Sequence, residues 1–580
     1  MANQEIAKIF QNIALYLEMQ DIAFKPQAYE KAALNLETLS EDVSEIYKKG
    51  GINALKEIPG IGENLAEKII EYIKTGKIKE YESLKKKMPV NIEELTSVEG
   101  IGPKMVRDLY KNLKIKNLAD LEKAAKAKKI RGLPHFGEKT EQNILESIEF
   151  LKRSKGRFLL GEILPKVQDI IEKLKKLKEI KSISEAGSVR RRKETIGDVD
   201  ILITSSNPKK IIDYFVSMPG VIKVWGKGPT KASIRLKENF DVDLRVLPEK
   251  QFGSALQYFT GSKEHNIVLR KTAIDRGLKL SEYGLFRATR DKRQETRLAG
   301  KTEKEIYSAL KMAYIEPELR ENTGEIEAAL KGNLPKIISY NAILGDLHVH
   351  SNWDGGENSI EELARQAMSI SYQYIGISDH TKFLRIEHGL NEKQLIQRNK
   401  EIDKINSKFK SQNSKFHILK GCEANILSDG SIDINDETLA KMDFVIAGVH
   451  SQMKMPKEKM TNRIITAMKN KNVDIISHPT GRILKRRDEY EIDFDKILEA
   501  AKYTNTILEI NSSPDRLDLK DINIKKAKQA GVKMVINTDA HHIDHMRLME
   551  FGISQARRGW AEKKDIINAW PMEKMLKMLK

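Results

Sequence analysis

The strongest constraint on the fold of this 580-residue chain is a series of short apolar runs in its last part, each ending in a histidine or an acidic residue. The run Ile375–Ile377, for example, leads to Asp379 and His380. The other runs are 444–449 before His450, 473–476 before His478, 507–508 before Glu509, and 534–536 before Asp539 and His541. Repeated strand-then-helix units imply a parallel sheet or barrel, whose functional side chains gather where the strands end. Residues 341–580 are therefore predicted to form a parallel sheet or a distorted (β/α) barrel.

Eight residues of this region are candidate metal ligands. They are His348, His350, His380, Glu423, His450, His478, Asp539 and His541. His348 and His350 are two residues apart on a predicted strand, so their side chains share one face. Mixed nitrogen and oxygen donors suit Zn²⁺, Mn²⁺ or iron better than Mg²⁺ alone. The set predicts a cluster of two or three ions for phosphoester hydrolysis. Six of the chain's 12 histidines belong to it, which disfavours a set of unrelated structural histidines.

A second group of acidic residues lies in the middle of the chain. Asp198 and Asp200 are two residues apart at the start of a predicted strand, 201–204, so both carboxylates face the same side. Asp243 lies on a later predicted strand, 242–247. Three carboxylates on one face can hold a pair of Mg²⁺ ions, which prefer oxygen ligands. Two such ions activate an attacking 3′-hydroxyl and stabilise a leaving pyrophosphate.

Residues upstream of the first acid complete a phosphate-binding pattern. Gly187, Ser188 and Arg191 can hold phosphate, and Gly197 directly precedes Asp198. The whole pattern resembles the nucleotidyltransferase palm of family X DNA polymerases. By this resemblance, a dNTP and the new base pair would also contact Tyr258, Phe259, Gly261, Lys263, Asn266 and Arg270. Lys263 departs from the eukaryotic repair enzymes of the family, in which an acidic residue is expected at this position. Two interpretations of Lys263 stay open: it adds electrostatic affinity for the nucleotide, or it is a surface residue.

The N-terminal 150 residues are predicted to be helical throughout, with an internal repeat of glycine turns. Glycine permits a tight hairpin between two helices, and the amides of the second helix can bind a phosphate oxygen. The repeat resembles the helix-hairpin-helix motif, which contacts the DNA backbone without reading sequence. By resemblance, its carbonyls would hold Na⁺ or K⁺. The residues concerned are Lys56, Ile58, Gly60, Ile61 and Gly62 in the first copy and Thr96, Val98, Gly100, Ile101 and Gly102 in the second; 133–140 is a degenerate third copy.

The same region resembles the lyase domain of DNA polymerase beta in segments 28–33 and 62–69. Lys68 matches the lysine that forms a Schiff base in that family. Its amine could attack the aldehyde of an abasic sugar if its pKa were lowered. Asn64 stands where the family has another lysine, and a basic residue on a helix surface is the competing interpretation of Lys68.

The C-terminal ligand pattern resembles the PHP family of metal-dependent phosphoesterases. The first motif of that family usually ends in Ser-Asp-Gly, whereas segment 351–356 places the acid, Asp354, one position early. Asp354 is therefore the weaker candidate for a ninth ligand. The predicted division of the chain is a lyase-like helical domain with the first hairpin (1–90), a fingers-like hairpin domain (91–150), an α/β palm (151–248), a thumb (249–315), a linker (316–340) and the PHP barrel (341–580).

Composition supports a partner of negative charge. The chain carries a net charge of +18, which favours nucleic acid, although solvated lysines on helix faces give the same number. A single cysteine, Cys422, excludes an internal disulfide and fits a reducing cytosol. No apolar run long enough to cross a membrane and no signal-peptide layout are found, so a cytoplasmic location without membrane contact is expected.

Together these patterns predict a monomeric repair enzyme that fills short gaps in gapped or nicked DNA, as in base excision repair. Its PHP domain would act as a 3′–5′ exonuclease, with AP endonuclease, 3′-phosphatase or 5′-deoxyribose-phosphate lyase activity as further possibilities implied by the resemblance. Two alternatives remain open. One is a DNA-bound nuclease whose palm only senses nucleotides, and the other is a scaffold without catalysis.

Overall fold

The computed structural model describes residues 2–39, 42–58, 60–98, 101–134, 136–153, 156–287 and 296–579. The chain forms two compact units, one of residues 1–155 with 485–487 and the other of residues 156–484 with 488–580. Within these described ranges, none of the helices combines the length and the apolar character that a bilayer crossing requires.

The first unit is helical over the part of it that the structure describes, as predicted. Its core begins on the apolar face of the first helix, where Ile6, Phe10 and Ile13 are fully buried. The helices are α1 (Ala2–Met19), α2 (Lys25–Thr38), α3 (Val43–Lys56), α4 (Glu63–Thr75), α5 (Lys79–Lys87), α6 (Ile92–Thr96), α7 (Pro103–Leu113), α8 (Leu118–Lys126) and α9 (Glu138–Arg153).

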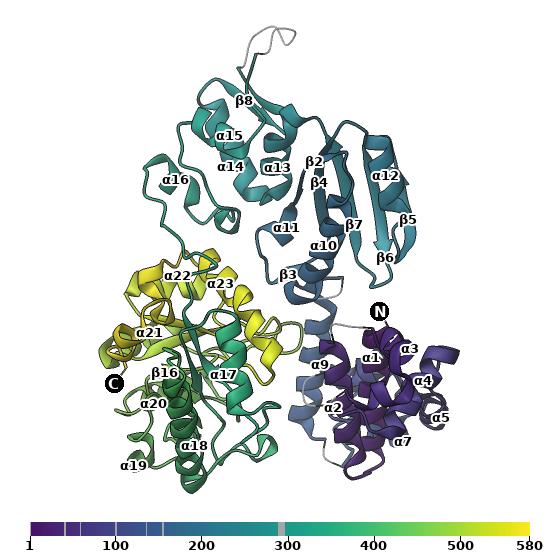
Figure 1. The fold of residues 1–580 in the computed structure, drawn as a ribbon, viewed down its shortest axis with the longest axis vertical. Coiled ribbons are helices and arrows are strands. Elements are labelled where there is room, and N and C mark those ends of the chain that lie inside the picture. The colour runs from purple at the N-terminus through teal and green to yellow at the C-terminus, as the bar shows by residue number, and fades with distance from the viewer. Residues whose placement is uncertain are drawn as a thin grey trace. The chain divides into compact units, whose positions relative to one another are not determined.

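The second unit begins with a five-stranded sheet in the order β2-β4-β7-β6-β5, in which only β4 and β7 are parallel (Figure 1). The strands are β2 (Ile180–Glu185), β4 (Val199–Ser205), β5 (Val221–Lys227), β6 (Lys231–Leu236) and β7 (Asp241–Leu247). Two short strands, β1 (Phe158–Leu159) and β3 (Thr195–Ile196), pair with each other. The helices around the sheet are α10 (Leu160–Lys175), α11 (Gly187–Arg190), α12 (Pro208–Val216) and α13 (Phe252–Thr260).

Alternation along the central strands decides which side chains the sheet buries. Ile201 and Ile203 of β4 pack with α10 and α12, whereas Leu202 packs with Ala255 of α13 on the opposite face. Because side chains alternate along a strand, Asp200 faces the same side as Leu202, toward α11 and α13. Asp200, the acidic residue of β4, thus lies on the sheet face that carries the phosphate-binding pattern.

The thumb follows the palm and is larger than the sequence predicted. It contains α14 (Lys263–Ile274), β8 (Leu278–Ser281), β9 (Gly284–Arg287), β10 (Arg297–Ala299) and α15 (Glu303–Ala309). Residues 316–340, expected to be a linker, begin with η3 (Pro317–Leu319) and α16 (Glu325–Leu330). Leu319 and Ile326 are buried in the same apolar cluster as Leu269 of α14. The difference arises because charged residues of this segment are ion-paired rather than solvated. Arg320 and Glu325 pair within the thumb, whereas Glu318 and Glu321 pair with arginines of the barrel and the palm.

The remaining strands form a parallel barrel, as predicted. Sheets β11-β12-β13 and β14-β15-β16-β17-β18 are joined by parallel bridges between His380 and Glu423 and between Val349 and Ala540. The strands are β11 (Gly345–Val349), β12 (Tyr374–Ile377), β13 (His417–Lys420), β14 (Glu423–Asn425), β15 (Ile446–Gly448), β16 (Ile475–Ile476), β17 (Ile507–Asn511) and β18 (Met534–Asn537). The main helices around them are α17 (Ile360–Ser369), α18 (Glu392–Ser411), α20 (Lys457–Met468), α21 (Phe494–Thr504), α22 (Asp521–Ala530) and α23 (Met549–Arg558) (Figure 1).

The barrel packs directly against the palm within this second unit. Leu517 and Phe551 of the barrel are buried in the apolar cluster of the palm sheet. A Cβ added at Gly161 of α10 would lie 2.4 Å from Pro514 Cβ, so glycine allows this close approach. An ion pair of 2.6 Å between Arg482 and Glu194 also crosses the contact. Palm and barrel therefore share one continuous core.

Candidate active sites

The palm brings its three predicted acidic residues together. Asp200 on β4 lies directly opposite Asp243 on β7 in the parallel register, and Asp198 precedes β4 on the same face. Burial, followed by the negative charges of Asp198 and Asp243, raises the pKa of Asp200 to about 6. Mutual repulsion of this kind shows that the three carboxylates share one small region, as a site for divalent cations requires.

The residues predicted to bind nucleotide line one cavity of about 510 Å³ beside these acids. Arg157 and Lys193, which sequence reasoning missed, also line it and add positive charge. The predicted residues in its wall are Gly187, Ser188, Arg191, Asp198, Tyr258, Phe259, Gly261, Lys263, Asn266 and Arg270. Gly197 does not line the cavity, but a Cβ there would lie 3.3 Å from Nη1 of Arg157. The wall combines cations, two aromatic rings and an amide, which suits a nucleoside triphosphate.

Oxygen donors dominate the palm site, which fits Mg²⁺. Asp198 is exposed and Asp200 and Asp243 are half-buried, so a long substrate can reach them. Lys231 on β6 lies 3.1 Å from Asp243 through its Nζ and was not predicted from the sequence. This cation balances part of the negative charge of the three acids.

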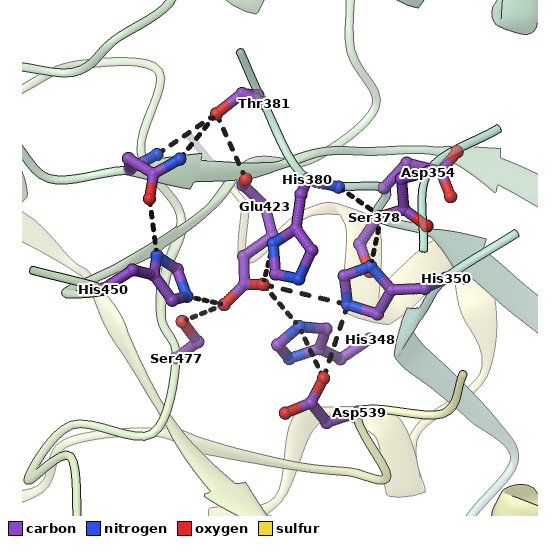
Figure 2. A network of polar contacts seen from close by, with 12 residues as sticks. His348, His350, Asp354, Ser378, His380, Thr381, Glu423, His450, Ser477 and Asp539 are labelled. Atoms are coloured by element: carbon purple, nitrogen blue, oxygen red, sulfur yellow. Dashed lines mark hydrogen bonds and ion pairs between the residues drawn. The ribbon is translucent and has the colours of Figure 1, made fainter. Parts of the chain in front are cut away.

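In the barrel, Glu423 at the start of β14 occupies the centre of the predicted ligand set (Figure 2). Its Oε2 lies 2.9 Å from His380 Nδ1 and 3.3 Å from His348 Nε2. Its Oε1 lies 3.0 Å from His478 Nε2 and 3.3 Å from His450 Nε2. Four histidines from four strand ends thus converge on one buried carboxylate.

Asp539 forms a second centre opposite Glu423 (Figure 2). Its Oδ1 lies 3.4 Å from His350 Nε2, 3.5 Å from His348 Nε2 and 3.8 Å from His541 Nδ1. All eight predicted ligands are therefore brought together. Three of the groups with metal-like spacing are His350 with His380 and His541, His348 with His350 and Asp539, and His380 with Glu423 and His450.

The donor atoms that face the middle of this site lack hydrogen-bond partners although they are buried. Such atoms are costly unless a ligand satisfies them. They are His348 Nε2, His350 Nε2, His380 Nδ1, His450 Nε2, His478 Nδ1 and Glu423 Oε2. Burial lowers the pKa of His450 and His541 to about 4, which keeps both rings in the neutral form that binds metal. The site thus fits a cluster of metal ions.

A shell of acidic and amide groups holds the histidine rings from outside. Asp354 Oδ2 accepts hydrogen bonds from His350 Nδ1 at 2.8 Å and from the main-chain N of His380 at 2.7 Å. Asp354 therefore occupies an orienting position rather than facing the middle of the cluster. In the same way, Glu509 Oε1 lies 2.7 Å from His348 Nδ1, and Asn425 Oδ1 lies 2.7 Å from His450 Nδ1.

The predicted ligand set left out two residues that lie at this site. Glu509 ends one of the apolar runs, and that position alone was the signal that could have found it. Arg516, in the loop after β17, lies 3.7 Å from Asp539 through its Nε and had no such signal. A carboxylate that fixes the ring of a ligand and an arginine beside a ligand acid are common around metal centres because they set geometry and charge.

The glycine repeats of the first unit share one main-chain hydrogen bond between described residues. The main-chain N of Ile61 donates to Ile58 O at 3.0 Å, and that of Ile101 donates to Val98 O at 3.1 Å. In the third copy the main-chain N of Phe136 donates to Leu133 O at 3.0 Å, so the degenerate copy has the same hydrogen bond. Lys56 ends α3 and Thr96 ends α6, and Gly62 and Gly102 directly precede α4 and α7. Gly60 has φ +74, whereas Gly100 lies outside the described residues.

Lys68 on α4 is held by an acidic partner. Its Nζ lies 3.0 Å from Glu80 Oε2 and donates to Asn64 Oδ1 at 2.7 Å. Tyr29 donates to the same Glu80 oxygen at 2.7 Å. Glu80 is half-buried; burial raises its pKa, but the hydrogen bonds from Tyr29 and Lys68 outweigh burial and leave it lowered. The Nζ of Lys68 is thus engaged by an ion pair and a hydrogen bond on the protein itself.

Four family models match parts of this chain. Family models match for a helix-hairpin-helix domain over residues 1–78, a SAM-like helix-hairpin-helix tandem over 92–149, the DNA polymerase beta thumb over 255–321 and the PHP domain over 346–513. Hairpin domains, a palm with a polymerase thumb and a PHP barrel on one chain define a polymerase-type enzyme class.

Similarity to individual proteins identifies the family within this enzyme class. The chain is 38% identical to the DNA polymerase/3′-5′ exonuclease PolX of Bacillus subtilis (strain 168) over an alignment that covers all of both proteins. A part of the chain, 34% of its length, is 33% identical to probable phosphatases of Caldanaerobacter subterraneus and Clostridium acetobutylicum, of which it covers 75% and 78%. The chain therefore belongs to the family X DNA polymerases that carry a C-terminal PHP domain.

Proposed function

We propose that this protein is a DNA-directed DNA polymerase that fills short gaps and trims 3′ ends with its PHP domain as a 3′–5′ exonuclease. The observation that carries the first activity is the shared face of Asp198, Asp200 and Asp243 beside a cationic, aromatic cavity. The observation that carries the second is the buried cluster around Glu423, with its unpartnered histidine nitrogens. The match to PolX over its full length supports both activities in one chain.

In the palm, the three acids would hold two Mg²⁺ ions, which supply activation of the primer 3′-hydroxyl and charge neutralisation on the triphosphate. Ser188, Arg191 and Lys193 line the cavity and would bind the phosphates of a dNTP. The rings of Tyr258 and Phe259 pack edge-to-face, with 5.1 Å between their centroids, and offer apolar surface to the sugar and base. Asn266 and Arg270 on α14 would face the new base pair.

In the PHP domain, the eight ligands would hold two or three ions, Mn²⁺, Zn²⁺ or iron, which supply Lewis-acid activation of water for phosphodiester hydrolysis. Glu423 and Asp539 provide the anionic centres. Burial lowers the pKa of His348, but the carboxylates of Glu509, Glu423 and Asp539 outweigh burial and raise this pKa well above its usual value. Charges that favour a proton on that ring equally favour a metal cation beside it. Arg516 is placed to offset charge on a substrate phosphate.

The three hairpins of the N-terminal unit would grip gapped or nicked DNA through its backbone. Their carbonyls at Lys56, Ile58 and Ile61 and at Thr96, Val98 and Ile101 would hold Na⁺ or K⁺ between protein and phosphate. A monomer in the cytoplasm that acts in base excision repair fits these proposals and the net charge of +18.

A lyase activity at Lys68 would be suppressed by its acidic partner. We expect slow borohydride trapping of the protein on a 5′-deoxyribose-phosphate end, because the ion pair with Glu80 and the hydrogen bond to Asn64 engage the Nζ of Lys68. Glu80→Gln should speed trapping about tenfold, since it removes the ion pair that holds this nitrogen. Lys68→Ala in the Glu80→Gln background is the control and should abolish trapping. Unchanged trapping in Glu80→Gln would refute this role of Glu80.

The experiment that tests the proposed function uses DNA with a one-nucleotide gap and a labelled primer. With dNTPs and Mg²⁺ the primer should lengthen by one nucleotide, and without dNTPs but with Mn²⁺ it should shorten from its 3′ end. Shortening without any extension would instead identify a nuclease with a nucleotide-sensing palm. DNA binding without either reaction, in protein loaded with metal, would identify a scaffold.

A further inference from the structure

The contact between palm and barrel places a buried arginine of the PHP domain behind the nucleotide cavity. Arg558 is the last residue of α23, and its side chain is 1% exposed. Its Nη1 donates to the main-chain O of Arg191 at 2.8 Å and to Oε1 of Glu321 at 3.0 Å. Its Nη2 donates to Asp521 of the barrel. One guanidinium thus ties the PHP domain to the palm and the thumb at once.

Glu321 links this arginine to the cavity wall. The Oε1 atom that accepts from Arg558 also accepts from Arg191 Nε at 3.0 Å. Oε2 of Glu321 lies 3.7 Å from Nζ of Lys193. Arg191 and Lys193 both line the cavity in which the triphosphate is proposed to bind. Arg558 therefore acts on the cavity through one shared carboxylate.

Arg191 is held at both of its ends by this network. Its main-chain O, at the C-terminal end of α11, accepts from Arg558, while its side chain is fixed by Glu321 and donates to the main-chain O of Thr260. Glu321 is held ionised in turn; burial raises its pKa, but Arg558, Arg191 and Lys193 outweigh this and leave the pKa lowered. Buried hydrogen-bond networks rigidify the groups they connect. In this network both terminal nitrogens of Arg558 are bonded, whereas its Nε makes no hydrogen bond to any described residue.

We propose that Arg558 is a positioning residue for the polymerase site: the PHP domain fixes Arg191 so that its guanidinium meets the incoming triphosphate without reorganisation. Arg558 itself does not touch the nucleotide. Fixing a binding group before the ligand arrives reduces the entropy lost on binding, so the effect falls on dNTP affinity. The proposal rests on the proposed polymerase function and adds to it a dependence of nucleotide binding on the PHP domain.

The neighbouring arginine of α23 provides a matched control. Arg557 crosses the same contact, donating from Nε to Glu318 at 2.7 Å and from Nη1 to the main-chain O of Ile338 at 2.8 Å, and it does not bond Arg191 or Glu321. Arg557→Met and Arg558→Met each remove one buried cation from one helix end. A general loosening of the contact would affect both variants alike, whereas positioning of Arg191 involves Arg558 alone.

The test measures KM for the dNTP and kcat in one-nucleotide gap filling, together with dNTP affinity for a complex whose primer cannot be extended. Arg558→Met should raise both KM and the dissociation constant about tenfold with a smaller change in kcat, since one charge-assisted hydrogen-bond set is lost. Arg557→Met should leave KM within about twofold, and both variants should retain 3′ trimming. Arg558→Lys, which keeps a donor, should recover part of the affinity.

Two outcomes would overturn the proposal: an unchanged KM in Arg558→Met, or equal increases in the Arg557 and Arg558 variants. If Arg558→Met does not fold, Glu321→Gln and Arg558→Lys replace it, and the two changes combined should cost less than the product of their separate effects because they act in one network. Full multiplicativity would contradict the shared network. Failure of the wild-type protein to extend the primer would instead refute the proposed function.

Discussion

The palm site and the PHP site both gather acids at the ends of strands, yet they differ in donors and burial. The palm offers three carboxylates on one sheet face, and the side chain of Asp243 is 33% exposed. The PHP site adds six histidines, and the side chains of His348 and Glu423 are 0% and 1% exposed. An open oxygen site suits exchangeable Mg²⁺ and a long substrate, whereas a buried mixed site suits tightly held transition metals.

The largest effect that tests this difference between the two sites should follow from removing two ligands of the buried PHP site. His348→Ala combined with His350→Ala should reduce 3′ trimming to background, because every group of metal-like spacing around Asp539 includes one of these rings. Gap filling should persist and also reports that the variant is folded. Trimming at the wild-type rate in this variant would show that the ligands have been assigned wrongly.

Removing one palm acid should have the converse effect. Asp243→Asn keeps the size of the side chain but deletes one anionic ligand, so extension should fall by about 10²–10³-fold or more, as for loss of a group that stabilises transition-state charge. Trimming should be unchanged because the barrel ligands lie on other strands. Parallel loss of both reactions in folded protein would mean that the two sites are not independent.

A smaller effect should distinguish ligands from the groups that orient them. Asp354→Asn removes the anionic acceptor that holds His350 and the backbone of His380. Such a change costs about 10–100-fold in metal affinity or activity. Metal titration followed by trimming assays would measure both quantities. A loss as complete as that of the double histidine variant would make Asp354 a ligand, and no loss would remove its orienting role.

Local patterns predicted the parts of both sites that depend on strand alternation and strand ends. The two-residue spacing of His348 and His350, and of Asp198 and Asp200, fixed their common faces before the fold was known. The apolar runs likewise predicted that distant histidines would meet, because parallel strands end at one edge of a barrel.

Contacts between distant segments could not be predicted in this way. Glu321 and Arg558 are 237 residues apart and meet only because α23 packs against the palm and thumb. The expected linker folds into the thumb for the same reason, since the partners of Arg320 and Glu325 are buried side chains elsewhere in that domain. Glu80, the partner of Lys68, lies on the next helix and carries no signal of its own in the sequence.

The central claim is that one chain carries two metal sites of different donor chemistry that drive two different reactions. Its most direct test strips the protein of tightly bound ions, supplies Mg²⁺ alone, and follows extension and 3′ trimming on the same labelled, gapped DNA. Extension should proceed, whereas trimming should stop and return when Mn²⁺ or Zn²⁺ is added. Trimming at full rate with Mg²⁺ alone, or loss and recovery of both reactions with the same ion, would contradict the claim.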